Sequence, residues 1–289
     1  MRYLILGGNG YLGAKITKYL VDQEQDVVCT KRAKSNLSRL TEYLDKITLI
    51  PATADAVEVA FLYEQFDWVI NMACNYGRST VLYDNVIESN IMFPLAVLNL
   101  AAEHNVKNYL TIGTGLPDEL NMYSFSKSKF SDFGKFYVEK HNMNFTNLRL
   151  EMFYGADEPV ERFLPKCLRK MLKNEELLVT EGTQHRDIIS SYDVIGVIKC
   201  ALNAQLTGYH EIPVGTGEAP SIREILEYMK QKTKSESKIC FGAVPMRNGE
   251  PDCVADTTKL KEIGYVCKYS WKEGIDKMIK EVTENENIN

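Results

Sequence analysis

Residues 1–13 read MRYLILGGNGYLG, and this stretch decides the fold. Residues 2–6 predict a short apolar strand, and Gly7, Gly10 and Gly13 follow it where a helix over residues 11–21 begins. Glycines let the backbone turn tightly and approach a pyrophosphate, while the N-terminus of a helix offers N–H groups to the same anion. This order of strand, loop and helix predicts a dinucleotide-binding unit. The spacing differs from G-x-G-x-x-G, and the alternative is a plain turn between strand and helix.

Short apolar runs alternate with amphipathic stretches through the first half of the chain. The further predicted strands are 26–30, 47–51, 68–73, 109–112 and 145–150, and the further helices are 86–104 and 123–141. This alternation predicts an α/β fold, a doubly wound parallel sheet of the Rossmann type. Turn signals break the second half into short pieces, which predicts a second, smaller α/β substrate lobe. We expect residues 1–152 to form the dinucleotide-binding domain, to which 187–210 returns, and 153–289 to form the lobe.

The composition argues against several classes of protein. The chain carries 34 Lys and Arg against 39 Asp and Glu, a net charge of −5, whereas nucleic-acid binders usually carry a basic excess. We expect no membrane span, because no run of about 18 apolar residues occurs. The run at 3–6 is also too short for a signal peptide. The 7 cysteines form no C-x-x-C and the 4 histidines no H-x-x-x-H, so we expect reduced thiols, no metal site and a cytoplasmic location.

The end of the second predicted strand bears on the choice of dinucleotide. Ligands of such sheets bind at the carboxyl ends of the strands, where this strand ends in Thr30, Lys31 and Arg32. NAD selection would place an acidic residue there, and Asp26 lies at the wrong end of the strand. Lys31 and Arg32 instead suit a 2′-phosphate. The sequence therefore favours NADP(H), with NAD(H) as the alternative if the two basic residues form a solvated loop.

Tyr123 and Lys127 are candidates for proton transfer. Their spacing of four residues puts phenol and ammonium on one face of a helix, a turn apart. An ammonium stabilises phenolate and so lowers the pKa of a tyrosine, which suits it to protonate a carbonyl oxygen during reduction. Thr114 follows a predicted strand and can hold the same oxygen. The Tyr-x-x-x-Lys pattern is weak by itself and gains weight from its order after the glycine loop and the buried strands.

Together these motifs resemble the extended short-chain dehydrogenase/reductases, the epimerase/dehydratase family that modifies nucleotide sugars. The motifs that carry the resemblance are Gly7-x-x-Gly10-x-x-Gly13, 71–74 (NMAC), Asn90, Thr114, Tyr123-x-x-x-Lys127, 149–155 (RLEMFYG), Arg186-Asp187, 214–217 (VGTG), 247–250 (RNGE) and 256–259 (DTTK). Residues 73–77 (ACNYG), 148–151 (LRLE) and 241–243 (FGA) look most like the CDP-abequose and CDP-paratose synthases. Those enzymes are 4-ketoreductases of CDP-linked 3,6-dideoxyhexoses in deoxysugar biosynthesis.

The resemblance implies a role for each matching residue. Tyr123 would protonate the C4 oxygen of the sugar, Lys127 would lower the pKa of Tyr123 and hold the nicotinamide ribose, and Thr114 would orient the oxygen. The expected cofactor contacts are Gly7, Gly10, Tyr11, Leu12, Gly13, Thr30, Lys31, Arg32, Asp55, Met72, Ala73, Cys74, Asn90 and Lys127. The expected substrate contacts are Asn75, Tyr76, Arg186 and Arg247, the two arginines as a clamp for the diphosphate. For these arginines the alternative is a salt bridge.

Three functions remain open on the sequence. The first is NADPH-dependent reduction of a nucleotide-linked 4-keto sugar. The second is an NAD-dependent 4-epimerase, which uses the same tyrosine and lysine but keeps its NAD bound. The third is a regulator that binds the cofactor without catalysis. A 4,6-dehydratase is disfavoured, because Gly115 and Leu116 follow Thr114 where the dehydratases carry Asp-Glu. Glu151 also stands where the family usually has Asn.

A homodimer is also expected from the resemblance. Many relatives pair through two helices that correspond to residues 86–104 and 123–141. The second of these carries Phe125, Phe130, Phe133 and Phe136, which is more aromatic residues than one helix face needs. The alternative is that all four pack inward.

Overall fold

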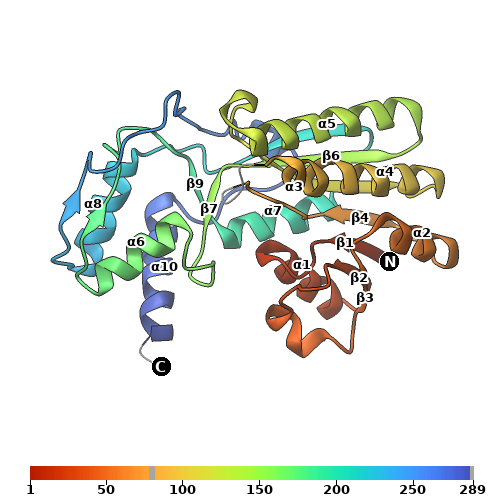
Figure 1. Ribbon diagram of the computed structural model, residues 1–289, viewed down its shortest axis with the longest axis horizontal. Coiled ribbons are helices and arrows are strands. Elements are labelled where there is room, and N and C mark those ends of the chain that lie inside the picture. The colour runs from red at the N-terminus through yellow and green to blue at the C-terminus, as the bar shows by residue number, and fades with distance from the viewer. Residues whose placement is uncertain (78–81, 287–289) are drawn as a thin grey trace. The chain divides into compact units, whose positions relative to one another are not determined.

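The computed structural model describes residues 1–77 and 82–286, the side chains of 285 and 286 excepted. The chain divides into two compact units, one of Met1–Arg149 and Ile198–Ile212, the other of Leu150–Val197 and Pro213–Asn289 (Figure 1). The first unit ends at Arg149, where the sequence predicted an end at residue 152. The segment that returns to it is Ile198–Ile212 instead of 187–210.

One sheet of seven strands, counted among the described residues, forms the frame of the first unit. Its order is β10-β6-β5-β4-β1-β2-β3. The bounds are β1 Arg2–Leu6, β2 Asp26–Lys31, β3 Thr48–Pro51, β4 Trp68–Asn71, β5 Asn108–Thr114, β6 Asn144–Leu150 and β10 Tyr209–Val214. Leu6 pairs with Thr30 of β2 and with Asn71 of β4 in parallel register. The carboxyl ends of these strands therefore meet at one edge, as the doubly wound fold predicts.

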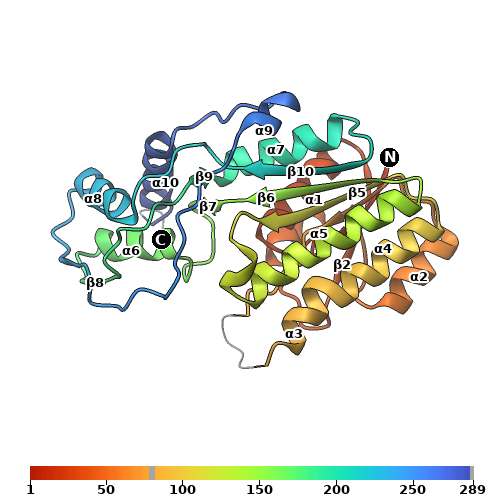
Figure 2. The ribbon, with the colours of Figure 1, turned by 90° about the horizontal axis from the view of Figure 1, so that it is seen from above.

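Helices cover both faces of this sheet. The helices α2 (Ala54–Tyr63), α4 (Phe93–Glu103) and α5 (Met122–Lys140) lie side by side over one face (Figure 2). The other face carries α1 (Tyr11–Asp22) and the end of α7 (Ser191–Asn203), where the Lys199 ammonium lies 4.0 Å from the Tyr19 ring centroid. Short 3-10 turns at η1 (Ser38–Tyr43) and η3 (Asp118–Leu120) follow β2 and β5. Apolar side chains from both layers, among them Leu4, Val97 and Phe130, make the core.

The helix predicted over 86–104 is interrupted. The structure has α3 (Asp84–Ile87), then a π-helical turn η2 (Glu88–Met92), then α4. Pro94 explains the interruption, because it has no N–H to donate to the carbonyl of Asn90 four residues earlier. By length and composition alone Asp84–Glu103 is apolar enough to cross a membrane, but its buried residues belong to the core of the first unit.

The second unit has its own core. The helices α6 (Phe163–Leu172), α8 (Ile222–Thr233) and α10 (Trp271–Glu286) pack together, and α9 (Thr258–Glu262) is a short turn. Among the described residues its strands form two small parallel sheets, β7 (Met152–Tyr154) with β9 (Ile188–Ser190), and β8 (Leu177–Leu178) with β11 (Ile239–Cys240). This short, interrupted pattern is the smaller α/β lobe that the turn signals predicted.

Candidate active site

The glycine loop forms a cradle of bare backbone. Gly7 has a φ of +75°, and a Cβ added there would lie 3.0 Å from the Ala73 nitrogen. A Cβ on Gly13 would lie 2.2 Å from the carbonyl oxygen of Gly7, which also accepts a 3.0 Å hydrogen bond from the Gly10 N–H. Gly10 caps α1 without a side chain, and the first turn of Tyr11–Asp22 holds no acidic residue. The N–H groups and the positive end of this helix therefore suit the pyrophosphate of a dinucleotide.

The loop after β2 is tied to the glycine loop. The Thr30 hydroxyl is buried and accepts a 3.4 Å hydrogen bond from the Gly7 N–H, while Asn9 Nδ2 donates to the Asn36 carbonyl at 3.2 Å. Between these two anchors, Lys31 ends the strand and Arg32 is exposed. The basic pair predicted to select the dinucleotide thus lies at the end of β2 and the start of a loop that is held to the glycine loop. Asp55, one of the expected cofactor contacts, is exposed in the first turn of α2.

The segment after β4 is clamped by Asn90. Asn90 is 1 % exposed, and its amide oxygen accepts from the Asn75 N–H at 2.8 Å. Its Nδ2 donates to the Asn75 carbonyl at 2.9 Å and to the Ser126 hydroxyl at 3.0 Å. Asn90 therefore fixes residues 73–76 against α5. Met72 and Ala73 lie at the start of this segment, half-buried, whereas Cys74 is exposed.

Tyr123 and Lys127 face this same segment. The Asn121 side chain accepts from the Ser124 N–H at 3.0 Å and so caps α5 just before Tyr123. The Tyr123 ring lies 5.0 Å from that of Tyr76, centroid to centroid. Lys127, only 4 % exposed, donates from Nζ to the Ala73 carbonyl at 3.1 Å. Burial lowers the pKa of Lys127, and the nearby Cys74 partly opposes this. A buried ammonium one turn from a phenol is the arrangement that proton transfer requires.

Thr114 ends β5, and its hydroxyl oxygen accepts from the Leu116 N–H at 3.3 Å. This contact uses a lone pair of the oxygen and leaves the hydroxyl hydrogen to donate elsewhere. The turn beyond is held to α5, because the Ser128 hydroxyl donates to Asp118 Oδ2 at 2.6 Å. A role of this hydroxyl toward a substrate oxygen stays a prediction.

Arg186 and Arg247 belong to the second unit. The guanidinium of Arg186 is buried and donates to the Glu250 carboxylate, to the Pro251 carbonyl and, at 3.2 Å, to the His185 carbonyl. The salt bridge that the sequence left as an alternative is therefore present for Arg186. Arg247 is exposed on the turn that supplies Glu250. A role of either arginine as a diphosphate clamp stays a prediction.

Asp187 organises the loops around Arg186. Its buried carboxylate accepts from the Thr216 N–H at 2.8 Å, the Thr216 hydroxyl at 2.7 Å, the Gly217 N–H at 2.9 Å and the Ala255 N–H at 3.2 Å. A Cβ on Gly215 would lie 2.3 Å from the carboxylate, so glycine is needed there. The Asp187 carboxylate thus joins the Arg186-Asp187 motif to the VGTG motif at residues 214–217.

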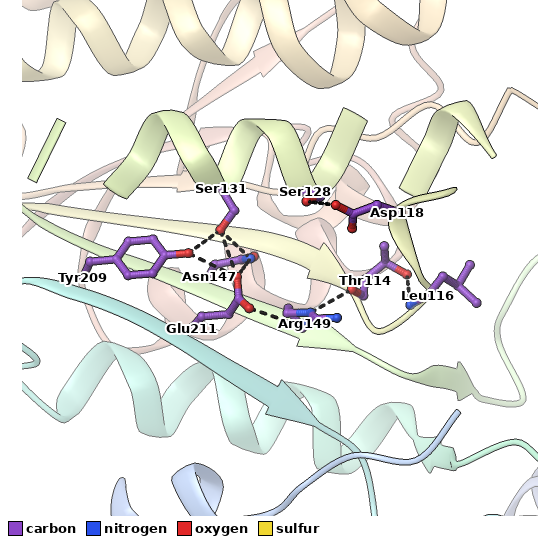
Figure 3. Close-up of polar contacts among 9 residues, drawn as sticks. All are labelled: Thr114, Leu116, Asp118, Ser128, Ser131, Asn147, Arg149, Tyr209 and Glu211. Atoms are coloured by element: carbon purple, nitrogen blue, oxygen red, sulfur yellow. Dashed lines mark hydrogen bonds and ion pairs between the residues drawn. The ribbon is translucent and has the colours of Figure 1, made fainter. Parts of the chain in front are cut away.

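Sequence reasoning missed a polar network between β6 and β10, at one edge of the sheet. Arg149 of β6 contacts Glu211 of β10, which contacts side chains of Ser131, Asn147 and Tyr209 (Figure 3). Arg149 lies in a motif that carried the resemblance, but no motif in the sequence around Glu211 indicated a role for Glu211. In the described part of the chain, no group of three His, Cys, Asp or Glu side chains could hold a metal ion.

A family model described as the NAD dependent epimerase/dehydratase family matches residues 3–215. The chain belongs to this family. This confirms the resemblance seen in the sequence, the Rossmann-type fold and the class of enzyme. In this member of the family, the glycine loop at residues 7–13 is the site that suits a dinucleotide.

Two relatives and one solved structure match this family member over nearly its whole length. CDP-abequose synthase of Salmonella muenchen is 26 % identical over 290 residues, which cover 96 % of this chain and 97 % of that protein. A putative UDP-glucose 4-epimerase of Methanocaldococcus jannaschii is 23 % identical and covers 98 % of both chains. The structure of UDP-glucose 4-epimerase from Thermotoga maritima with UDP-glucose has a TM-score of 0.88 at 19 % identity, covering 99 % of this chain and 100 % of that one.

Proposed function

We propose that this enzyme reduces the C4 ketone of a nucleotide-linked deoxyhexose with NADPH, a CDP-4-keto-3,6-dideoxyhexose being the first substrate to try. The observation that carries the proposal is the buried Lys127 ammonium at the Ala73 carbonyl, one helical turn after Tyr123. The full-length similarity to CDP-abequose synthase supports reduction over the other reactions of the family. The absence of an acidic residue at Thr30-Lys31-Arg32 supports NADP(H).

The chemistry follows from three side chains of the first unit. The nicotinamide, when bound, supplies the hydride for the ketone carbon. Tyr123 donates its phenolic proton to the oxygen as the carbonyl becomes an alcohol. The Lys127 ammonium stabilises the phenolate left behind and so keeps Tyr123 acidic enough at neutral pH. Thr114 donates its hydroxyl hydrogen to the same oxygen, since the Leu116 N–H occupies only a lone pair of the Thr114 oxygen.

The proposal is tested with the purified protein. NADPH oxidation is followed by absorbance with CDP-4-keto-3,6-dideoxyglucose, and a thermal-shift panel compares CDP-, UDP-, GDP- and dTDP-sugars with NADP(H) and NAD(H). We expect turnover with NADPH and the largest shift from a CDP-sugar. Tightly retained NAD together with no NADPH turnover would overturn the reductase.

The second candidate is an NAD-dependent nucleotide-sugar 4-epimerase. The similarity to the putative UDP-glucose 4-epimerase along 98 % of the chain favours it. Tyr123, Lys127 and Thr114 would serve both reactions, so the test above separates them by cofactor retention. A regulator without catalysis is the weakest candidate, because the chain carries Tyr123, Lys127 and Thr114 together.

Arg32 is expected to decide the dinucleotide preference. Changing Arg32→Asp replaces a partner of the 2′-phosphate by a repelling carboxylate. A hydrogen bond to a charged group contributes about 1.5–3 kcal/mol, so NADPH should bind roughly 10- to 100-fold more weakly, while NADH affinity stays within about twofold. Isothermal titration with both cofactors measures this.

Lys46→Asp is the matched control for the charge change. Lys46 is exposed and precedes β3, so it lies at the amino ends of the strands, away from the site. The NADPH affinity of Lys46→Asp should equal that of the wild type. Equal NADPH affinity for Arg32→Asp and the wild type would place the 2′-phosphate elsewhere or identify the cofactor as NAD.

We also propose that the protein is a cytoplasmic homodimer. Phe130 is 1 % exposed and packs inward, but Phe125, Phe133 and Phe136 are 44 %, 37 % and 53 % exposed on α5. The alternative that all four pack inward is therefore wrong. An apolar helix face of this kind suits a second copy of the chain. The cysteines are all free thiols, which supports a reducing compartment.

The double change Phe133→Glu and Phe136→Glu should separate the dimer. Burying two charges in an apolar interface costs more free energy than the apolar contact contributes. Light scattering should therefore give a monomer where the wild type gives a dimer. Phe163→Glu, on a residue equally exposed on α6 of the second unit, is the control and should remain dimeric. A monomeric wild type would contradict the proposal.

A further inference from the structure

A chain of polar contacts crosses three neighbouring strands and ends at Thr114. Arg149 of β6 donates from Nε to the main-chain carbonyl of Thr114 at 3.2 Å. Its NH1 donates to Glu211 Oε1 of β10 at 3.1 Å. Figure 3 shows the guanidinium between these two acceptors. Glu211 lies 62 residues from Arg149 in sequence and comes from the segment that returns to the first unit.

The carboxylate of Glu211 is itself fixed. Its Oε2 accepts from the Tyr209 hydroxyl at 3.1 Å, the Ser131 hydroxyl at 3.2 Å and Asn147 Nδ2 at 3.2 Å. Partial burial opposes ionisation, but the charge of Arg149 and these hydrogen bonds hold the pKa of Glu211 below its usual range. Glu211 therefore stays a charged acceptor with a fixed orientation. This orientation in turn fixes the position of the Arg149 guanidinium.

Thr114 lies beyond the part of β5 that β4 supports. Asn71, the last residue of β4, pairs with Thr111 of β5, so Thr114 extends beyond the end of β4. β6 pairs with β5 on the other side, and two further contacts reach Thr114, the Leu116 N–H on its hydroxyl oxygen and the Arg149 guanidinium on its carbonyl. The first sets the rotation of the hydroxyl, and the second sets the direction of the peptide that carries it.

We propose that Arg149, oriented by Glu211, is a positioning residue that holds the Thr114 hydroxyl in line with the substrate oxygen. The inference rests on the proposed function, in which Thr114 contacts that oxygen. Small displacements of a group that orients a reacting atom are costly, up to about 100-fold in rate for roughly 1 Å. Loss of Arg149 should therefore lower kcat without weakening cofactor binding.

A merely structural ion pair would behave differently. The side chains of Arg149 and Glu211 are 36 % and 32 % exposed, and pairs exposed to this extent contribute little to stability. Arg2 offers a matched comparison in the same sheet. It pairs with Asp26 and Glu64 and is 33 % exposed, but it lies at the amino end of β1, opposite the site. Arg2→Met and Arg149→Met should therefore lower the melting temperature by similar, small amounts.

The experiment compares Arg149→Met, Arg149→Lys, Glu211→Gln and Arg2→Met in the full chain. We expect Arg149→Met to lower kcat roughly 10- to 100-fold, with KM and NADPH affinity within about twofold of the wild type. Arg149→Lys should keep the stability but recover little of kcat, because an ammonium lacks the fork that spans both acceptors. Arg149→Met with Glu211→Gln should cost no more than Arg149→Met alone. Arg2→Met should keep the wild-type kcat.

A second readout needs no substrate. The Leu116 amide should exchange its hydrogen at least about tenfold faster in Arg149→Met, and at the wild-type rate in Arg2→Met, as measured by NMR. Unchanged exchange in Arg149→Met, or a kcat equal to that of Arg2→Met, would overturn the positioning role. If the wild type turns over no ketone, the proposed function fails by itself, and the exchange rate still decides whether Arg149 holds Thr114.

Discussion

Replacing Tyr123 by phenylalanine should lower kcat for ketone reduction by at least about 100-fold, the usual scale for a lost general acid. The substitution removes one oxygen and leaves the ring, which lies 5.0 Å from Tyr76, in place. The capping of α5 by Asn121 is also untouched. NADPH affinity and the melting temperature should therefore remain close to those of the wild type. Steady-state turnover and titration of the same preparation measure both quantities.

Tyr137→Phe is the matched control. Tyr137 is on the same helix, and its hydroxyl donates to Asn99 at 3.2 Å, away from the segment after β4. The control should keep the wild-type kcat. If Tyr123→Phe reduced the ketone as fast as Tyr137→Phe, another group would be the proton donor and the proposed mechanism would be wrong.

The second large effect is expected for Gly13→Ala. The added Cβ would lie 2.2 Å from the carbonyl oxygen of Gly7, and both atoms belong to the backbone, so no side-chain rotation relieves the clash. The loop must move away from α1 and the cradle opens. Overpacking of this kind costs about 1–3 kcal/mol, and we expect a loss of dinucleotide affinity of roughly 10- to 100-fold together with a lower melting temperature.

Gly10→Ala is the graded comparison for this prediction. Its added Cβ would lie 3.2 Å from the same oxygen, so a small shift accommodates it and the loss of affinity should be smaller. Calorimetric titration with NADPH gives the two affinities, and thermal unfolding without cofactor gives the two stabilities. Wild-type affinity in Gly13→Ala would mean that the loop is only a turn between strand and helix.

Most of the first unit was predictable because its signals are local. An apolar run and the turn that ends it lie within a few residues, so the strands from β1 to β6 and the start of α1 followed from the sequence. The same reasoning placed Tyr123 and Lys127 on one helix face. The interruption at Glu88–Met92 was missed, although Pro94 was its visible cause. A helical pattern of apolar residues continues across a π-turn and hides it.

The contacts that were missed join residues far apart in the chain. Arg149 and Glu211 are separated by 62 residues, and Arg186 and Glu250 by 64. A charged residue in a sequence carries no mark of its partner, so Arg186 was predicted to bind a diphosphate, with a salt bridge as the alternative. For the three exposed phenylalanines of α5, the sequence predicted only that the helix carries more aromatic residues than one face needs. A helical pattern does not show which of the rings is exposed.

The clamp made by Asn90 has a consequence for protein engineering. The Asn90 side chain joins the Asn75 backbone to Ser126, so it ties the loop after β4 to α5. Because Asn90 bonds the main-chain N–H and carbonyl of Asn75, exchanging the side chains of residues 73–76 would leave this joint in place, whereas replacing Asn90 would break it. A library that varies this loop should therefore keep Asn90 and Ser126, which hold the loop backbone to α5 whatever side chains the loop carries.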